Sequence, residues 1–226
     1  MSRLVIAVDG PAAAGKGTLA QRLSAALQLA YLDTGKLYRA AAARLLDEGG
    51  DPRDARAAAR VARMLEAEDL ARPDLRAQHV GEAASEISVH REVRAALLDF
   101  QRNFARQPPR ACRGAVLDGR DIGTVVCPDA QVKLFITATR EVRARRRHEE
   151  LLARGETPIY RHVLAEIEAR DARDRERAAA PLRTAPDAVI LDTTSLNADE
   201  AFAAAMAIVA EKTGCASQGA CPAAAD

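Results

Sequence analysis

The residue types at positions 10–18, GPAAAGKGT, suit this segment to hold the phosphates of a nucleotide. Glycine and alanine have no side chain beyond Cβ, so backbone N–H groups can come close to phosphate oxygens. Lys16 adds a compact positive charge, which suits the β- and γ-phosphates better than the planar guanidinium of arginine. Only four of the 33 basic residues are lysine, so a lysine at this position stands out against the composition. We predict an ATP-binding loop made of Gly10, Pro11, Ala12, Ala13, Ala14, Gly15, Lys16, Gly17 and Thr18.

The residue after Lys16 is Gly17, where phosphate loops commonly carry the serine or threonine that ligates magnesium. The hydroxyl is shifted by one position, to Thr18. We therefore expect Mg²⁺ to be held mainly by ATP and water, without a dedicated metal site in the protein. Asp118, at the end of a later strand, is the one carboxylate that could reach the ion through water. A glycine turn that only caps a helix is the alternative for the loop as a whole.

Two further segments place polar residues where a strand ends, LDTGKLYR at 32–39 and LDGRDIGT at 117–124. The carboxyl ends of parallel strands form the ligand-binding edge of an α/β sheet, so both segments should face the phosphate loop. Each also has a structural interpretation. Asp33 or Thr34 could serve only as a helix N-cap, and Arg120 with Asp121 could be a buried ion pair that holds a loop.

The helical segment RDARDRER, residues 170–177, is the third polar patch. Arg170, Asp174 and Arg177 are spaced to share one helix face, whereas Asp171 and Arg173 are predicted to point elsewhere. A solvated, ion-paired helix is the alternative interpretation. Transfer of a phosphoryl group to a phosphate acceptor brings two polyanions together, so arginines should converge from different segments. The three polar segments each offer one, namely Arg39, Arg120 and Arg177.

The elements that must position these residues alternate between strand and helix. Short segments with apolar runs at 3–10, 29–35, 115–121, 131–138 and 188–194 predict five strands. Amphipathic helices follow the phosphate loop and residue 35, one longer helix is expected from Ser85, and two arginine-rich helices meet near Gly155 and Pro158. The alternation predicts an α/β fold of three layers, with a central five-stranded parallel sheet and helices on both faces. Residues 1–213 should form one domain, followed by a disordered tail at 214–226 that contains Cys215 and Cys221.

Composition excludes several classes of function. The net charge of +1 provides no field that would attract nucleic acid or an anionic membrane. No apolar run approaches the roughly 18 residues of a membrane span, and the N-terminal apolar stretch is too short for a signal peptide. The four cysteines form no CxxC pair, and the histidines lack metal-ligand spacing. We expect a cytoplasmic enzyme or switch.

Six segments in chain order resemble the bacterial cytidylate kinase family: IAVDGPAAAGKGT, LDTGKLYRA, VLDGRDIGTVVCPDA, KLFITA, RDARDRERAAAPL and DAVILDTT. The phosphate loop alone fits many unrelated proteins, but GRDIGT together with RDxxDxxR and APL is far more specific. The resemblance implies a P-loop kinase fold that transfers the ATP γ-phosphate to CMP or dCMP. It also implies a monomer, an acceptor-binding insert at roughly 40–84 and an arginine-rich lid at roughly 143–170.

The resemblance also assigns residues to roles. Lys16, Arg120 and Arg177 would be catalytic, and lid arginines, Arg146 with Arg143 and Arg147, would swing onto the ATP phosphates. CMP would be bound by Thr34, Tyr38, Arg39, Ser85, Arg94, Arg120, Asp121, Arg170, Asp174 and Arg177. Of these, Ser85, Arg94 and Asp121 would read the cytosine edge. Cytosine has an amino donor at N4 and acceptors at N3 and O2, whereas uracil reverses positions 3 and 4.

Two departures from the family pattern stand out. The insert is about fifteen residues shorter than the resemblance leads us to expect, and Lys36 replaces a usual alanine. Two other functions stay open. One is a kinase for another acceptor, such as UMP or dTMP. The other is an ATP-dependent switch without transfer activity, which only the shortened insert favours.

Overall fold

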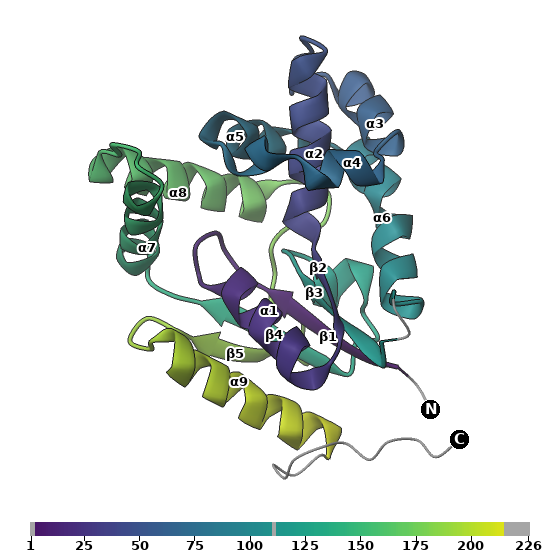
Figure 1. Ribbon diagram of the computed structural model, residues 1–226, viewed down its shortest axis with the longest axis vertical. Helices are drawn as coiled ribbons and strands as arrows, with labels where there is room; N and C mark the ends of the chain where they lie inside the picture. Colours follow the sequence, from purple (N-terminus) through teal and green to yellow (C-terminus); the bar gives the residue numbers. More distant parts are fainter. Residues whose placement is uncertain (1–2, 110–111, 215–226) are drawn as a thin grey trace.

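A parallel sheet of five strands forms the centre of the computed structural model, which describes residues 3–109 and 112–214 (Figure 1). The strands lie in the order β2-β3-β1-β4-β5, and every neighbouring pair is parallel. Their bounds are β1 (Leu4–Asp9), β2 (Ala30–Asp33), β3 (Gly114–Asp118), β4 (Val132–Thr137) and β5 (Val189–Asp192). The predicted five-stranded parallel sheet is confirmed.

Helices cover both faces of the sheet, which confirms the three-layer prediction. Helices α1 (Lys16–Leu27) and α9 (Ala198–Thr213) pack on one face, over Ile6 and Val8 of β1. Helix α6 (Arg91–Arg106) and a π-helical turn (Ile122–Val126) cover the other, over Ala7 and Leu117. Successive side chains of a strand point to opposite faces, so the apolar run of β1 contributes to both layers.

A helical lobe stands beyond the carboxyl ends of the strands (Figure 1). It contains α2 (Thr34–Asp47), α3 (Ala55–Arg63), α4 (Ala67–Ala71), a 3₁₀ helix (Pro73–Arg76) and α5 (Gln78–Ile87). Alanines and leucines of α2, α3, α5 and α6 form its core. The predicted insert would begin inside α2, and its limits stay a prediction.

The prediction of a single long helix from Ser85 is wrong. Helix α5 ends at Ile87, and α6 begins at Arg91. The Ser88 hydroxyl donates to the carbonyl of Ser85 at 2.8 Å, which satisfies a carbonyl in the last turn of α5. Phe100, on α6, is 48% exposed.

Two helices extend along the side of the lobe, α7 (Arg140–Ala153) and α8 (Tyr160–Glu176). Gly155 lies between them with a φ of 79°, a left-handed conformation that glycine adopts without strain. The two predicted arginine-rich helices are thereby confirmed. None of the helices in the described ranges is long and apolar enough to span a membrane. The predicted tail at 214–226 lies outside the described residues, apart from Gly214, which is the C-cap of α9.

Candidate active site

The phosphate loop connects β1 to α1, as its glycines require. A Cβ on Gly10 would lie 2.0 Å from the carbonyl oxygen of Ile136, so no other residue fits there. Gly15 caps α1 with a φ of 89°, and Ala13 also has a positive φ, of 58°. This backbone directs N–H groups toward one point at the start of a helix, the arrangement that binds anions.

Lys16 is held inside the loop, with its side chain only 5% exposed and its Nζ donating to Pro11 O at 2.7 Å. Burial lowers the pKa of this ammonium, and the neighbouring Arg120 lowers it further. Burial disfavours the charged form of the nearby Asp118 carboxyl too, and so raises its pKa to about 6. Phosphate oxygens placed against Lys16 would favour its charged form.

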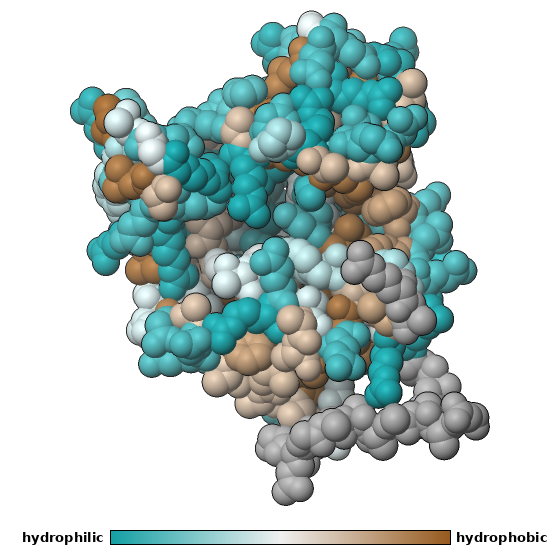
Figure 2. All heavy atoms as spheres, viewed as in Figure 1, coloured by the Kyte–Doolittle hydropathy of each residue, from teal (hydrophilic) through white to brown (hydrophobic). Residues whose placement is uncertain are grey.

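The candidate active site is a cavity of about 670 Å³ between the loop, the lobe and α8. In the space-filling view, hydrophilic side chains gather around the hollow below the lobe (Figure 2). All ten residues predicted to bind the acceptor line the cavity: Thr34, Tyr38, Arg39, Ser85, Arg94, Arg120, Asp121, Arg170, Asp174 and Arg177. Ala12, Ala13, Gly15, Lys16, Gly17, Thr18 and Asp118 line it too. The structure therefore brings residues from five separate segments to one place.

Arginine and aspartate side chains alternate in an ion-pair network that lines this cavity. Arg94 Nη2 lies 2.6 Å from Asp121 Oδ2, and Arg120 Nε lies 2.8 Å from Asp174 Oδ2. Arg177 stands between the two carboxylates, 3.7 Å from Asp174 Oδ1 and 4.0 Å from Asp121 Oδ1. Burial works against the charged Asp174 carboxylate, but Arg120 and Arg170 outweigh it and lower its pKa. The alternative of a buried Arg120–Asp121 pair is wrong, because Arg120 pairs with Asp174.

Several donors in this network have no acceptor. Arg177 Nη2 and Arg170 Nε are buried and form no hydrogen bond within the described part of the chain. Burial, with the positive charge of Arg120, lowers the pKa of Arg170. Buried donors without partners are rare in folded proteins. Arg170 and Arg177 both line the cavity, where an anionic ligand would supply acceptors for arginine donors.

Other predicted residues have structural partners. Thr34 donates its hydroxyl to Asp118 O at 2.7 Å, which joins α2 to the end of β3, while Asp33 caps α2 by accepting from Lys36 N. Arg94 lies over the Tyr38 ring, 5.5 Å from its centroid. Lys36 is exposed and is absent from the cavity lining.

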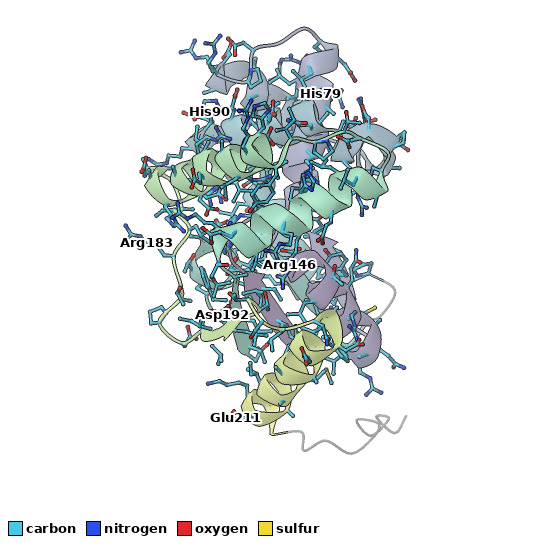
Figure 3. The ribbon with its side chains drawn as sticks, turned by 90° about the vertical axis from the view of Figure 1, so that its left-hand side faces the viewer. His79, His90, Arg146, Arg183, Asp192 and Glu211 are labelled. Atoms are coloured by element: carbon cyan, nitrogen blue, oxygen red, sulfur yellow. The ribbon has the colours of Figure 1, made fainter. Side chains whose placement is uncertain are left out.

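The lid arginines do not behave alike. Arg146 projects from α7 toward the segment after β5, where it donates to Thr193 Oγ1 at 3.0 Å and Thr193 O at 2.7 Å (Figure 3). Gly10, Pro11, Ala14 and Arg146 are the predicted ATP-site residues that do not line the cavity. Arg143 is only 2% exposed and is paired with Asp171. The Arg143 guanidinium also donates to the carbonyls of Ala12 and Ala138, and its movement onto ATP stays a prediction.

Three polar residues that were not predicted to belong to the site contact it or support it. Asp171 points away from the cavity, as predicted, and forms the buried pair with Arg143. The same prediction is wrong for Arg173, which lines the cavity and donates to Ser85. Arg173 follows Arg170 by three residues, a spacing that could have placed it on the same face. Asp9, at the end of β1, accepts from the N–H groups of Ile122 at 2.8 Å and Gly123 at 2.7 Å, and so fixes the GRDIGT segment.

A phosphate loop at the start of α1, beside an arginine-lined second anion site at the same sheet edge, defines this protein as a P-loop kinase. The particular family follows from comparison with known proteins. The chain belongs to the cytidylate kinase family, whose model, Cytidylate kinase, matches residues 6–211.

Two curated relatives and one solved structure illustrate the likeness. The Cytidylate kinase of Paramagnetospirillum magneticum is 58% identical over 208 residues, which cover 92% of this chain and 98% of the relative. That of Acidiphilium cryptum is 58% identical over 206 residues, which cover 91% and 95%. A crystal structure of an uncharacterised protein from Eubacterium ventriosum has a TM-score of 0.51 at 13% identity, with 91% of this chain and 97% of that chain covered. This last likeness concerns the fold alone.

Proposed function

We propose that this protein transfers the γ-phosphate of ATP to CMP or dCMP and forms the corresponding diphosphate. The observation that carries the proposal is the single cavity in which a phosphate loop faces the Arg94–Asp121 pair and the unpartnered donors of Arg170 and Arg177. The curated relatives that are 58% identical over nearly the whole chain bear the name Cytidylate kinase, which supports the same substrate.

The reaction needs positioning and charge neutralisation more than proton transfer. An oxygen of the acceptor phosphate attacks the γ-phosphorus, the bond to the β–γ bridging oxygen breaks, and ADP leaves. The attacking oxygen is already anionic, so no general base is required. Lys16 binds the β- and γ-phosphates, while Arg39, Arg120 and Arg177 hold the acceptor phosphate in line.

The acceptor's base and sugar are recognised by the remaining polar groups. Asp121 accepts a hydrogen bond from the cytosine N4 amino group, and Arg94 donates to N3 and O2. Ser85 contacts the same edge. Asp174 and Arg170, together with Thr34 or Tyr38, face the sugar.

Magnesium enters as the complex with ATP, where it supplies positive charge that shields the β- and γ-phosphates. Nowhere in residues 3–109 or 112–214 do three His, Cys, Asp or Glu side chains form a group that could hold a metal ion. We propose, from the shifted hydroxyl of the phosphate loop, that the ion is bound mainly by ATP and water. Asp118, 8% exposed beside Gly17, is the carboxylate able to contact a magnesium-bound water.

The lid, at roughly residues 143–170, is proposed to close over ATP and to exclude water from the γ-phosphate. Arg146 is the lid residue assigned to ATP. We further propose, from the sequence, a monomeric cytoplasmic enzyme that needs neither nucleic acid nor a membrane.

The deciding experiment measures ADP production from magnesium ATP with CMP, dCMP, UMP, AMP and dTMP offered separately. Turnover with CMP and dCMP alone is expected. Turnover mainly with UMP or dTMP would reassign the acceptor, and the assignment of Arg94 and Asp121 to cytosine recognition would then be wrong. Tight ATP binding without turnover on any acceptor would identify a switch.

A further inference from the structure

We propose that Arg173 is a positioning residue that holds the Ser85 hydroxyl in the orientation that reads the acceptor's base. Arg173 Nε donates to Ser85 Oγ at 3.0 Å, although 88 residues separate them in the chain. The inference rests on the proposed function, because it concerns the same acceptor site. It adds a residue that the sequence analysis had placed outside that site.

Ser85 depends on this one bond. Its side chain is buried, with 3% of the residue exposed, and it lines the cavity near the end of α5. Within the described ranges, the Arg173 guanidinium is the sole hydrogen-bond partner of its hydroxyl. A serine hydroxyl can rotate to either side of its Cβ and can donate or accept. With one lone pair occupied by Arg173, the hydrogen and the other lone pair remain for a ligand in the cavity.

A second bond shows that α5 and α8 are aligned side by side. Gln78 Nε2 donates to Glu166 Oε1 at 2.6 Å, and this pair is also 88 residues apart. Ser85 lies seven residues after Gln78 on α5, and Arg173 lies seven residues after Glu166 on α8. Both bonds therefore connect the helices in one register, and α5 and α8 run parallel there. Seven residues correspond to roughly 10 Å along a helix. The Arg173–Ser85 bond is thus one end of a two-point connection between α5 of the lobe and α8.

Arg173 also lies in the middle of the ligand-binding face of α8. Steps of three or four residues place it on one stripe with Glu166, Arg170 and Arg177. Its neighbours on α8 are bound to charged partners: Asp174 to Arg120 and Asp171 to Arg143. Arg173, by contrast, forms no ion pair with any carboxylate of the described residues. Within the described residues, the Arg173 guanidinium donates its hydrogen bond to Ser85 and not to a carboxylate.

The consequence is a link between two parts of acceptor recognition. Helix α8 and its C-cap carry Arg170, Asp174 and Arg177, which are among the groups assigned to the sugar and phosphate. Helix α5 carries Ser85, which is assigned to the base. Without the bond from Arg173, Ser85 would be free to turn its hydroxyl away, and the lobe would lose its tie to α8 beside the base. The affinity for CMP should fall, whereas ATP, bound by the loop on the other side, should be unaffected.

A matched pair of substitutions isolates this bond. The Nε2 atom of glutamine is as many bonds from Cα as the Nε of arginine, so Arg173→Gln keeps a donor at the same place. Arg173→Met removes the same charge and puts a methyl group there. Arg173→Met should raise the KM for CMP about ten-fold, as expected for a lost hydrogen bond to a charged group. Its kcat and its KM for ATP should stay within about two-fold of wild type, and Arg173→Gln should restore most of the loss.

Combination with Ser85→Ala completes the test. If Arg173 acts through Ser85, the double variant Ser85→Ala with Arg173→Met should have the same KM for CMP as Ser85→Ala alone. Arg161→Met, an exposed arginine in the first turn of α8, is the control for loss of charge. Equal defects in the Gln and Met variants, or penalties that multiply in the double variant, would overturn the proposal. Failure of the wild-type enzyme to phosphorylate CMP would be seen before any variant is made, and it would remove the proposed function and this inference together.

Discussion

Arg143→Met is predicted to destabilise the protein strongly, because Arg143 and Asp171 form a buried, two-pronged ion pair. Each residue is 2% exposed, and Nη1–Oδ1 and Nη2–Oδ2 are 3.0 and 2.6 Å apart. Removal of one partner from such a pair costs about 3–5 kcal/mol, since the other charge stays buried without compensation. Arg175, 3.7 Å from Asp171 Oδ2 and exposed, compensates in part. We therefore expect a loss of about 3 kcal/mol, at the lower end of that range.

Urea denaturation at pH 7 measures this loss directly. The exposed pair of Arg140 and Glu168 joins the same two helices at 2.8 Å and is the matched control. Arg140→Met should cost no more than about 1 kcal/mol. A double variant, Arg143→Met with Asp171→Leu, should recover about half of the loss or more, because no charge is then left buried. It should not recover all of it, since Arg143 also donates to Ala12 O and Ala138 O.

The outcome separates two roles for Arg143. A structural residue lowers the free energy of unfolding, whereas one that swings onto the ATP phosphates lowers kcat with little change in stability. If Arg143→Met unfolds at the same urea concentration as Arg140→Met and has lost turnover, the buried pair is not what Arg143 provides, and our reasoning is refuted.

Three further predictions concern the site. Lys16→Met should lower kcat at least about 100-fold, as expected when a preorganised charge is removed from the transferring phosphate; unchanged single-turnover rates would contradict this. Arg94→Met should raise the KM for CMP far more than the KM for ATP, which steady-state kinetics with each substrate varied will test. Burial raises the pKa of Asp9 to about 6, so the folded state favours its protonated form, and its contribution to stability is lost as the pH rises from about 4 to about 6. Asp9→Asn should flatten this part of the stability profile in urea titrations, and an unchanged slope would show that Asp9 is not its source.

The fold and the phosphate loop could be predicted because their signals are local. The three central strands, β1, β3 and β4, are short apolar runs buried on both faces, and the loop is recognised from consecutive residues between a strand and a helix. The convergence of Arg39, Arg120 and Arg177 followed from chemistry, since two polyanions must be brought together. These inferences require only the order of the elements and the rule that strand ends share an edge.

Side-chain pairing could not be predicted, because it depends on how helices pack. The segment 170–177 is charged on nearly every side, so its sequence does not reveal which side faces protein. Asp171 became buried because α7 packs against α8 and brings Arg143 to it. The break between α5 and α6 also escaped detection, since it has no proline or glycine and depends on Ser88 and on His90, whose ring nitrogen contacts Pro52 O.

The carboxylates of the acceptor site serve two purposes, and this explains why so many arginines can be buried together. Arg94, Arg120 and Arg177 stand close enough to repel one another, and burial of each charge would be costly without a partner. Asp121 and Asp174 lie between them and fix their orientation before any ligand binds. Arg177 itself lines the cavity, and its Nη2 forms no hydrogen bond within the described residues. An acceptor phosphate then meets donors that need no reorganisation, which is the condition under which electrostatic stabilisation of a transferring phosphoryl group is most effective. Substitution of Asp174 should therefore weaken phosphate binding as well as sugar binding, because Arg120 would lose the carboxylate that fixes its orientation.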